Sequence, residues 1–242
     1  MKDELCKDEV ARFRVFKLAG ISEAATRELV RDLAVEDNAS IGYLTGPGEI
    51  QVRITIQDNS ANLDDKLEAI SAKVKARLED YIFVCDGEVI EDLVGRLLRQ
   101  RGLTIALAES CTGGLIAARL TNTPGSSEYV KGGVVSYTNE IKEKLLGVPP
   151  DILEKHGAVS RETASAMAEG IRDRASSDIG LSVTGIAGPG GDTPDKPLGL
   201  VYIGLSTSSG VLCSRYVFPG NRNGVRQGTV NAALNLVRRF LS

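Results

Sequence analysis

The chain has 242 residues with 42% hydrophobic residues, 25% charged residues and a formal net charge of −3 at pH 7. This is ordinary globular composition and suggests one or two domains. No apolar run approaches the roughly 20 residues that span a membrane, and the slight negative charge gives no general attraction to nucleic acid. The amino-terminal stretch has no apolar signal segment, so we expect a cytoplasmic protein without membrane contact.

The first third of the chain predicts a small α+β module. We expect strands at 12–18, 39–45, 49–57 and 81–85, and helices at 22–33 and about 63–79. The clearest of these is 49–57, where isoleucine and valine alternate with polar residues, as in a strand with one buried face. The order β-α-β-β-α-β is a split βαβ module. Asp86-Gly87 predicts a boundary, and we expect domains at 1–86 and 87–242.

We expect this module to dock or dimerise rather than to bind RNA. Residues 1–85 hold 12 Lys and Arg against 16 Asp and Glu, a net charge of −4. Phosphate contacts would have to supply most of the affinity for nucleic acid, and no Gly-x-x-Gly clamp joins a helix to a strand.

The rest of the chain alternates helices with strands. We expect helices at about 88–101, 113–121, 140–146, 151–156, 160–174 and 222–241, and strands at 104–109, 133–137, 178–184, 198–207 and 210–218. The alternation followed by a two-strand hairpin predicts a three-layer α/β/α domain with a mixed sheet.

One stretch of this second domain, Ile105 to Gly114 (IALAESCTGG), predicts a strand that enters a helix through a glycine turn. Such a turn leaves the first backbone N–H groups of the helix without partners, which suits an anion or a polarised oxygen. It also carries the reactive side chains of Ser110, Cys111 and Thr112 in succession. The alternative is that Ser110 or Thr112 only caps the helix.

Four polar, glycine-rich loops punctuate this domain, at 109–114, 123–127, 185–191 and 219–224. Loops beyond strand ends hold ligands in open α/β sheets, so they favour a small-molecule site over ordinary turns. None is a Walker loop or a dinucleotide fingerprint. The four cysteines are far apart and no cluster has metal-ligand spacing, so we expect no disulfide, no metal and no other cofactor.

The candidates for a catalytic base are few. The single histidine, His156, precedes a glycine at a predicted helix end, where histidine commonly meets the last carbonyls. The remaining organic option is a serine–lysine pair. Lys142 is expected in the first turn of a helix capped by Thr138 or Asn139, where the helix dipole disfavours its charge. The alternative is a solvated surface lysine.

Taken together, the motifs resemble the C-terminal domain of the CinA family, which contains the bacterial nicotinamide-nucleotide amidases. The matching motifs are AESCTGG (108–114), PGSSEYVKGGVVSYTNEIK (124–142), HGAVS (156–160), SVTGIAGPGG (182–191), KPLGLVYIG (196–204) and FPGNR (218–222). Residues 10–85 resemble the KH-like module of CinA proteins. These proteins usually begin with a molybdopterin-binding-like domain that hydrolyses ADP-ribose with metal help. That domain is missing from this sequence, so its activity is not expected.

The resemblance implies a metal-free amidohydrolase that converts nicotinamide mononucleotide (NMN) to nicotinate mononucleotide and ammonia, in pyridine nucleotide salvage. The family is described as using a Ser/Lys pair, whose nucleophile falls on Ser127 and whose lysine falls on Lys142. Ser110 and Tyr137 also belong to the implied catalytic site. Implied substrate-binding residues are Thr112, Gly113, Gly114, Thr184, Gly185, Gly188 and Arg222. The lysine motif departs from the family pattern only at Thr138 and Ile141, and a homo-oligomer, preferably a dimer, is expected.

Two other hypotheses stay open at this point. The chain could be a nucleotide-binding or docking protein that keeps the fold without chemistry, or a thiol hydrolase that uses Cys111. Ammonia release from NMN separates the amidase from the silent protein. Inactivation by thiol alkylation, with Cys111 protected by substrate, would favour the thiol hydrolase.

Overall fold

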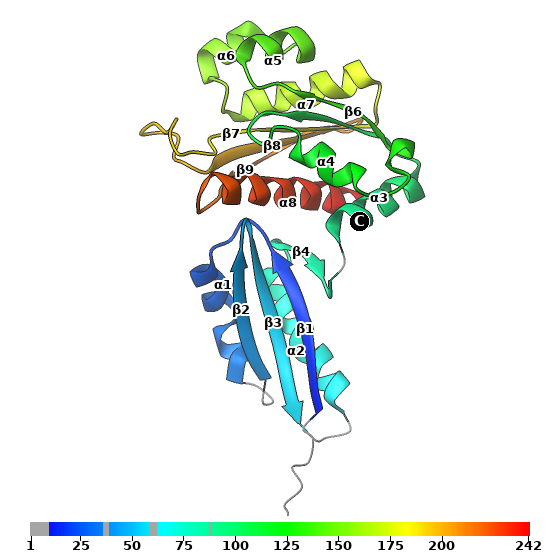
Figure 1. Cartoon of the computed structure of the whole chain (residues 1–242), viewed down its shortest axis with the longest axis vertical. Helices are drawn as coiled ribbons and strands as arrows, with labels where there is room; N and C mark the ends of the chain where they lie inside the picture. The colour runs from blue at the N-terminus through cyan, green and yellow to red at the C-terminus, as the bar shows by residue number, and fades with distance from the viewer. Residues whose placement is uncertain (1–9, 36–38, 59–61, 88) are drawn as a thin grey trace, which may run out of the picture. The chain divides into compact units, whose positions relative to one another are not determined.

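The computed structural model describes residues 10–35, 39–58, 62–87 and 89–242 and divides the chain into two compact units (Figure 1). The first unit extends to Gly87 and the second follows it, except that Pro47–Glu49 group with the second. Among the helices within the described ranges, none is long and apolar enough to cross a membrane.

The first unit is a four-stranded sheet with two helices. Its elements are β1 (Val10–Leu18), α1 (Glu23–Val30), the 3₁₀ turn η1 (Arg31–Val35), β2 (Ala39–Gly46), β3 (Glu49–Asp58), α2 (Leu63–Leu78) and β4 (Ile82–Cys85). The strand order is β2-β3-β1-β4, with β1 antiparallel to both of its neighbours. The expected element order is therefore found. The helix expected at 22–33 is shorter, because the chain tightens into η1 after Val30.

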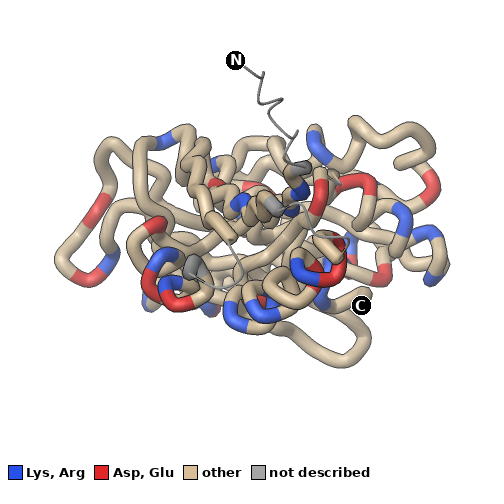
Figure 2. Tube along the Cα trace, turned by 90° about the horizontal axis from the view of Figure 1, so that it is seen from below, with Lys and Arg blue, Asp and Glu red and all other residues tan. Residues whose placement is uncertain are grey.

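The core of this unit follows from the apolar alternation in β3. Ile50, Val52, Ile54 and Ile56 are buried, and they share one cluster with the apolar stripe of α2. Each burial removes apolar surface from water, which stabilises the fold by about 25 cal/mol per Å². Figure 2 shows basic and acidic positions interspersed along the chain trace.

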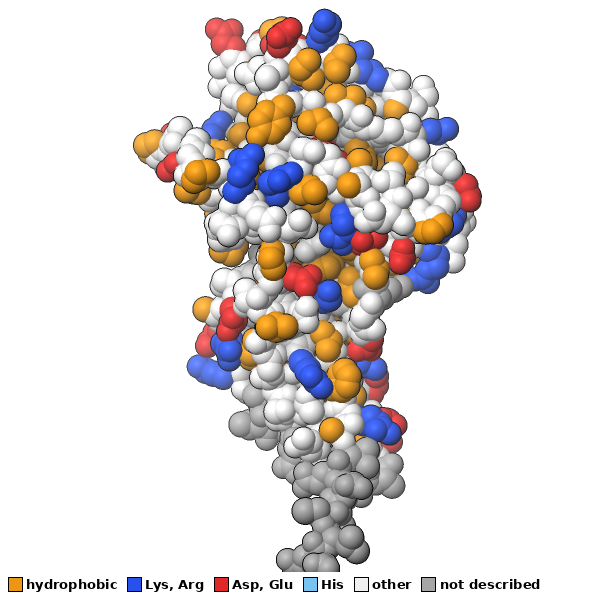
Figure 3. Space-filling model, in the orientation of Figure 1, with side chains coloured by type: hydrophobic (Ala, Val, Ile, Leu, Met, Phe, Trp, Pro, Cys, Tyr) orange, Lys and Arg blue, Asp and Glu red, His pale blue; other side chains and the backbone are white. Residues whose placement is uncertain are grey.

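The second unit is built on a five-stranded mixed sheet in the order β6-β5-β7-β8-β9. Its strands are β5 (Ile105–Glu109), β6 (Val130–Val135), β7 (Ile179–Gly185), β8 (Leu200–Thr207) and β9 (Gly210–Val217). β5 runs parallel to β6 and β7, whereas β8 is antiparallel to both β7 and β9. On the face drawn in Figure 3, hydrophobic side chains are distributed among polar and charged ones.

Helices cover both faces of this sheet, as expected for three layers. They are α3 (Ile90–Arg101), α4 (Leu115–Thr121), α5 (Asn139–Leu146), α6 (Pro150–His156), α7 (Arg161–Ala175) and α8 (Arg222–Leu241), with a 3₁₀ turn η2 (Ser126–Glu128) before β6. α7 packs on one face with α5 and α6 outside it, and α3, α4 and α8 lie together on the other face (Figure 1). α7 packs close to β7 because Gly180 of β7 has no side chain. A Cβ at this position would lie 2.1 Å from the carbonyl oxygen of Ala168 in α7.

The largest difference from the expected elements concerns β6, which spans Val130–Val135 instead of 133–137. Its parallel pairing begins at Ile105↔Val130 and ends at Glu109↔Val135. Ser136 and Tyr137 therefore follow the strand and belong to the loop that leads to α5. Glycines at 132 and 133 weaken the strand pattern in the sequence, and sheet pairing overrides that local signal.

Candidate functional site

Several of the polar loops meet at one edge of the second sheet because of strand direction. β5, β6 and β7 are parallel, so the segments after Glu109, Val135 and Gly185 leave the sheet at the same edge. β8 is antiparallel and begins at that edge, and β9 ends there before α8. The motifs around Ser110, Lys142, Gly188 and Arg222 are thereby gathered from four separate parts of the chain. Ligands bind at such edges in α/β sheets.

The loop at 123–127 is at the other edge of the sheet. Ser127 is exposed in η2, before the first residue of β6. The adjoining Tyr129 carbonyl accepts a hydrogen bond from Ile105, the first residue of β5. Lys142 lies in the first turn of α5, beyond the carboxyl end of β6, whereas Ser127 precedes the strand, whose six residues span about 15–20 Å. Among the described residues, the serine that is hydrogen-bonded to Lys142 is Ser110, and this favours Ser110 over the implied nucleophile Ser127 as its partner.

Ser110 is the serine that the structure places at Lys142. Ser110 directly follows β5, and its Oγ is 3.4 Å from Lys142 Nζ. The same Nζ donates a 2.7 Å hydrogen bond to the Ser136 carbonyl, which fixes the amine between the ends of β5 and β6. Of the two expected caps, Thr138 is the one that caps the helix carrying Lys142, because its hydroxyl accepts a hydrogen bond from the Ile141 amide. Ser110 is largely buried, with 9% of it exposed.

Lys142 is not a surface lysine. Only 1% of it is exposed, and no ion pair within the described ranges includes it. Burial lowers the pKa of the Lys142 amine, and the neighbouring Cys111 acts weakly in the opposite direction. A lysine with a lowered pKa is more often neutral and can accept a proton from a serine hydroxyl.

Cys111 has the wrong electrostatics for a nucleophile. It is 6% exposed, and burial raises the pKa of its thiol to about 12, although the amides of Cys111 and Thr112 act to lower it. Because the thiolate is the reactive form, a thiol with this pKa is almost fully protonated near neutral pH.

The first backbone N–H groups of α4 are occupied by a carboxylate, contrary to the expectation that they are free. The buried Glu109 accepts hydrogen bonds from the amides of Gly114, Ile116 and Ala117 at 2.8–3.1 Å. A carboxylate is stabilising at this end of a helix dipole. Gly114 therefore holds the turn together, and its amide is not available to a ligand.

We expect Glu109→Gln to lower thermal stability. The amide keeps one acceptor oxygen but turns an NH₂ group toward a helix amide, at a cost of about 2 kcal/mol. For a chain of this size that is a fall in Tm of about 4–8 °C. Differential scanning calorimetry measures it, with Glu143→Gln on the exposed face of α5 as the matched control. Equal Tm values for the two variants would contradict the capping role.

Arg222 joins three of the loops at this edge. Its Nη1 donates to the Gly188 carbonyl at 2.8 Å and its Nη2 donates to the Tyr137 hydroxyl at 2.9 Å. Tyr137 is 57% exposed, so its ring faces solvent beside the site. Since the guanidinium donates to the hydroxyl oxygen, the hydroxyl hydrogen stays free to bind a ligand.

The threonines implied as substrate contacts are enclosed. Thr184 is fully buried and donates its hydroxyl to the Ala158 carbonyl at 2.7 Å. Thr112 is also fully buried, and its hydroxyl has no partner within the described residues. Gly185 packs against β8, where a Cβ would stand 2.6 Å from Val201. These three residues pack inside the protein beneath the loops and support them. Gly113, by contrast, is exposed in the turn.

Sequence reasoning missed Arg226, one helical turn after Arg222 on α8. Its Nη2 donates to the Thr112 carbonyl at 2.8 Å, and its Nε is buried without a partner among the described residues. Only the four-residue spacing from Arg222 could have indicated it, since residues four apart share a helix face. His156 ends α6 as expected, and its carbonyl accepts a hydrogen bond from Lys196.

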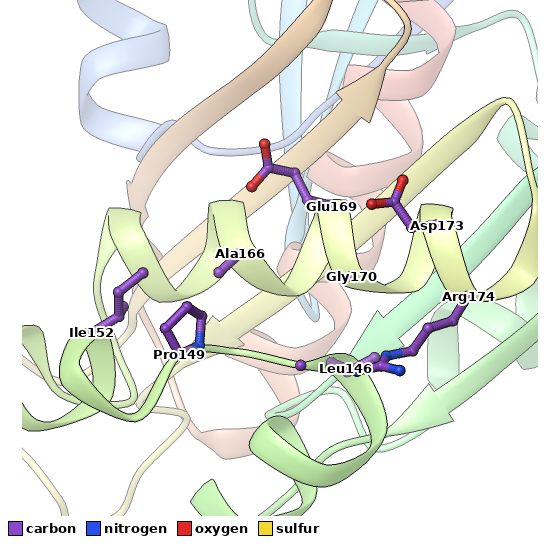
Figure 4. A pocket seen from close by; sticks show the side chains of 9 residues that line it. Leu146, Pro149, Ile152, Ala166, Glu169, Gly170, Asp173 and Arg174 are labelled. Atoms are coloured by element: carbon purple, nitrogen blue, oxygen red, sulfur yellow. The ribbon is translucent and has the colours of Figure 1, made fainter.

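The described residues contain no group of three or more His, Cys, Asp or Glu side chains that could hold a metal ion. A pocket of about 520 Å³ lies elsewhere, between α7 and the segment that joins α5 to α6 (Figure 4). Figure 4 shows Glu169 and Asp173 on α7, with Pro149 and Leu146 on the facing segment. None of the implied site residues lines this pocket.

Both units of the chain match known protein families. Residues 87–241 match the CinA C-terminal domain, and residues 13–84 match the KH domain of damage-inducible protein CinA. A relative from Desulforudis audaxviator, named "Putative competence-damage inducible protein", is 48% identical over 98% of this chain and 57% of its own length. A relative of the same name from Desulforamulus reducens is 51% identical over 94% of this chain and 56% of its own length. The chain thus spans little more than half the length of these relatives.

Solved structures match a little under two thirds of the chain. Competence/damage inducible protein CihA from Agrobacterium tumefaciens is 43% identical with a TM-score of 0.58, over 61% of this chain and 92% of its own. A CinA superfamily protein from Klebsiella pneumoniae is 31% identical with a TM-score of 0.61, over 64% of this chain and 98% of its own.

Proposed function

Because this chain belongs to the CinA family, we propose that it is a cytoplasmic amidohydrolase that converts NMN to nicotinate mononucleotide and ammonia, with Ser110 as nucleophile and Lys142 as base. One observation carries the proposal. A buried lysine with a lowered pKa has its Nζ 3.4 Å from the Ser110 hydroxyl, at the edge of the sheet where the parallel strands β5, β6 and β7 end. The family resemblance supplies the substrate, and the geometry supports Ser110 over Ser127 as the serine.

The proposed reaction proceeds in two steps. Ser110 Oγ attacks the carboxamide carbon while its proton passes to Lys142 Nζ. The resulting tetrahedral anion collapses, the C–N bond breaks, and ammonia leaves with the proton that Lys142 returns. Water then attacks the acyl ester of Ser110 with Lys142 again as base, which releases nicotinate mononucleotide and restores the serine.

Backbone amides are the proposed donors to the tetrahedral anion. In the turn after Ser110, the amides of Gly113 and Gly114 donate to Ser110 and Glu109. Among the described residues, no backbone carbonyl accepts a hydrogen bond from the amide of Cys111 or Thr112, and both amides act on the nearby Cys111 sulfur, a weak acceptor. They are the groups of this turn that we propose to donate hydrogen bonds to the developing oxyanion, and donors of this kind usually make a large contribution to catalysis.

Arg222 and Tyr137 are proposed to bind the nucleotide. Arg222 Nη1 and Nη2 donate to neutral oxygens, a carbonyl and a hydroxyl. A guanidinium held in this way keeps its positive charge for an anion such as the phosphate of NMN. The second candidate is a catalytically silent nucleotide-binding protein. The same contacts of Arg222 would serve it, since they bind a nucleotide whether or not Ser110 reacts.

Ammonia release from NMN tests the proposal directly. The wild-type chain should release ammonia and form nicotinate mononucleotide in equal amounts, with chelator present. Binding of NMN without ammonia release would identify the silent protein instead. Restoration of a lost activity by a divalent cation would contradict the metal-free mechanism.

Arg222→Ala should weaken the hydrolysis of NMN more than that of nicotinamide riboside, which lacks the phosphate. Loss of a charge-assisted contact to phosphate should raise the KM for NMN by about tenfold to hundredfold. Steady-state assays of both substrates measure this difference. Arg215→Ala, which changes an exposed arginine of β9, is the control. Equal losses on both substrates would assign Arg222 to the carboxamide end.

A fragment beginning near Cys85 should fold and keep the amidase activity. The second unit has its own sheet and helices, and the match to the CinA C-terminal domain, residues 87–241, lies within it but for Gly87. Circular dichroism and the ammonia assay check the expectation. An insoluble or inactive fragment would make the first unit part of the catalytic unit. We propose that the first unit serves docking or dimerisation, and the homodimer is tested by sedimentation of the full chain.

A further inference from the structure

Arg226 of α8 contacts the turn at residues 110–114, which follows β5. Its Nη2 donates to the Thr112 carbonyl at 2.8 Å, and its charge acts on the Cys111 thiol, whose pKa it helps to lower against the effect of burial. No ion pair within the described ranges gives Arg226 a carboxylate partner. Its charge is therefore directed at a peptide group beside Ser110.

Two peptide groups connect this guanidinium to the amide of Cys111. The Thr112 carbonyl and the Gly113 N–H belong to the same peptide group, and the Gly113 N–H donates to the Ser110 carbonyl at 3.1 Å. The Ser110 carbonyl and the Cys111 N–H form the next peptide group. A hydrogen bond to a peptide carbonyl polarises its N–H, and a charged donor at the start of a chain strengthens each later bond.

We propose that Arg226 is a positioning residue that polarises and orients the Cys111 amide toward the anion formed when Ser110 attacks its substrate. The inference rests on the proposed function, and it adds a residue and a role that the family motifs do not contain. Arg226 acts through the chain of Thr112, Gly113 and Ser110 without touching the substrate. Its effect belongs to the transition state, where the negative charge develops.

This role has a distinct kinetic signature. Arg226→Met should lower kcat by about tenfold, less than the hundredfold or more that follows loss of a whole oxyanion donor. KM should stay within about twofold, and the loss should be equal for NMN and for nicotinamide riboside. Arg226→Lys should recover most of the rate, because an ammonium can donate to the Thr112 carbonyl. Arg239→Met, an exposed position near the end of the same helix, should leave both constants unchanged.

Two outcomes of the kinetic and stability measurements would overturn the inference. A raised KM for NMN alone, with kcat intact, would make Arg226 a phosphate ligand. A lowered Tm with normal kcat in the folded fraction would make it a packing residue.

An NMR measurement keeps this test separate from the proposed function. The amide nitrogen resonance of Cys111 responds to the hydrogen bond at the Ser110 carbonyl. It should shift in Arg226→Met and stay in place in Arg226→Lys and Arg239→Met. An unchanged resonance in Arg226→Met overturns the inference, whether or not the wild-type chain hydrolyses NMN. If the resonance shifts but the protein releases no ammonia, the polarisation of the Cys111 amide by Arg226 would be supported and the amidase proposal would fail.

Discussion

Lys142→Met should abolish amide hydrolysis and at the same time make the protein more stable. Lys142 is 1% exposed and has no carboxylate partner within the described residues, so its charged form is costly in the fold. Methionine fills a similar volume without a charge, and we expect about 1–2 kcal/mol of added stability at pH 7. Calorimetry and the ammonia assay measure the two effects. Lys144→Met, on the exposed side of α5, should change neither.

The stability gain should depend on pH in one direction. Burial lowers the pKa of Lys142 below its ordinary value of 10.5, whereas the unfolded chain keeps that value. Between the two pKa values the unfolded state binds more protons, so the stability of the wild type rises with pH there. The advantage of Lys142→Met should therefore shrink as the pH approaches 10.5. A variant that is less stable than the wild type at pH 7 would contradict the account of a buried, uncompensated amine.

The rate of the wild type should also rise with pH, with a midpoint below 10.5, as Lys142 loses its proton and becomes a base. Lys142→Arg should be inactive, because a guanidinium does not deprotonate in this range. Activity in the arginine variant would assign the proton transfer to another group.

Ser110→Ala should lower kcat by at least about a thousandfold while NMN still binds, because the nucleophile is lost and the binding groups remain. The double variant Ser110→Ala with Lys142→Met should be no slower than either single variant, since nucleophile and base act as one unit. Cys111→Ala should change kcat by less than about tenfold, because its protonated thiol takes no part. Additive losses in the double variant would show that the two residues act in separate steps.

Much of the architecture could be predicted from local signals. Apolar alternation in β3, the Thr138 cap and the helix end at His156 are short-range features, and the structure contains all three. The three layers and the mixed sheet follow from the order of the elements.

The pairing of site residues could not be predicted in this way. Ser110 and Lys142 are 32 residues apart, and only the parallel register of β5 and β6 brings them together. Ser127 and Lys142 are closer in sequence, but β6 lies between them in the chain, so they are at opposite ends of this strand. The glycine turn predicts free amides, yet Glu109 folds back onto them, and carboxylate contacts of this kind leave no periodic pattern. For Arg226 the sequence offers only its four-residue spacing from Arg222, and its role becomes visible through its hydrogen bond to the Thr112 carbonyl.

The most direct test of the Ser110/Lys142 amidase is the initial rate of ammonia release from NMN by three proteins assayed side by side. The wild type should release ammonia, Ser127→Ala should release it at a comparable rate, and Ser110→Ala should release none above the uncatalysed background. Ammonia release by Ser110→Ala together with an inactive Ser127→Ala would contradict the account and return the nucleophile to the loop before β6.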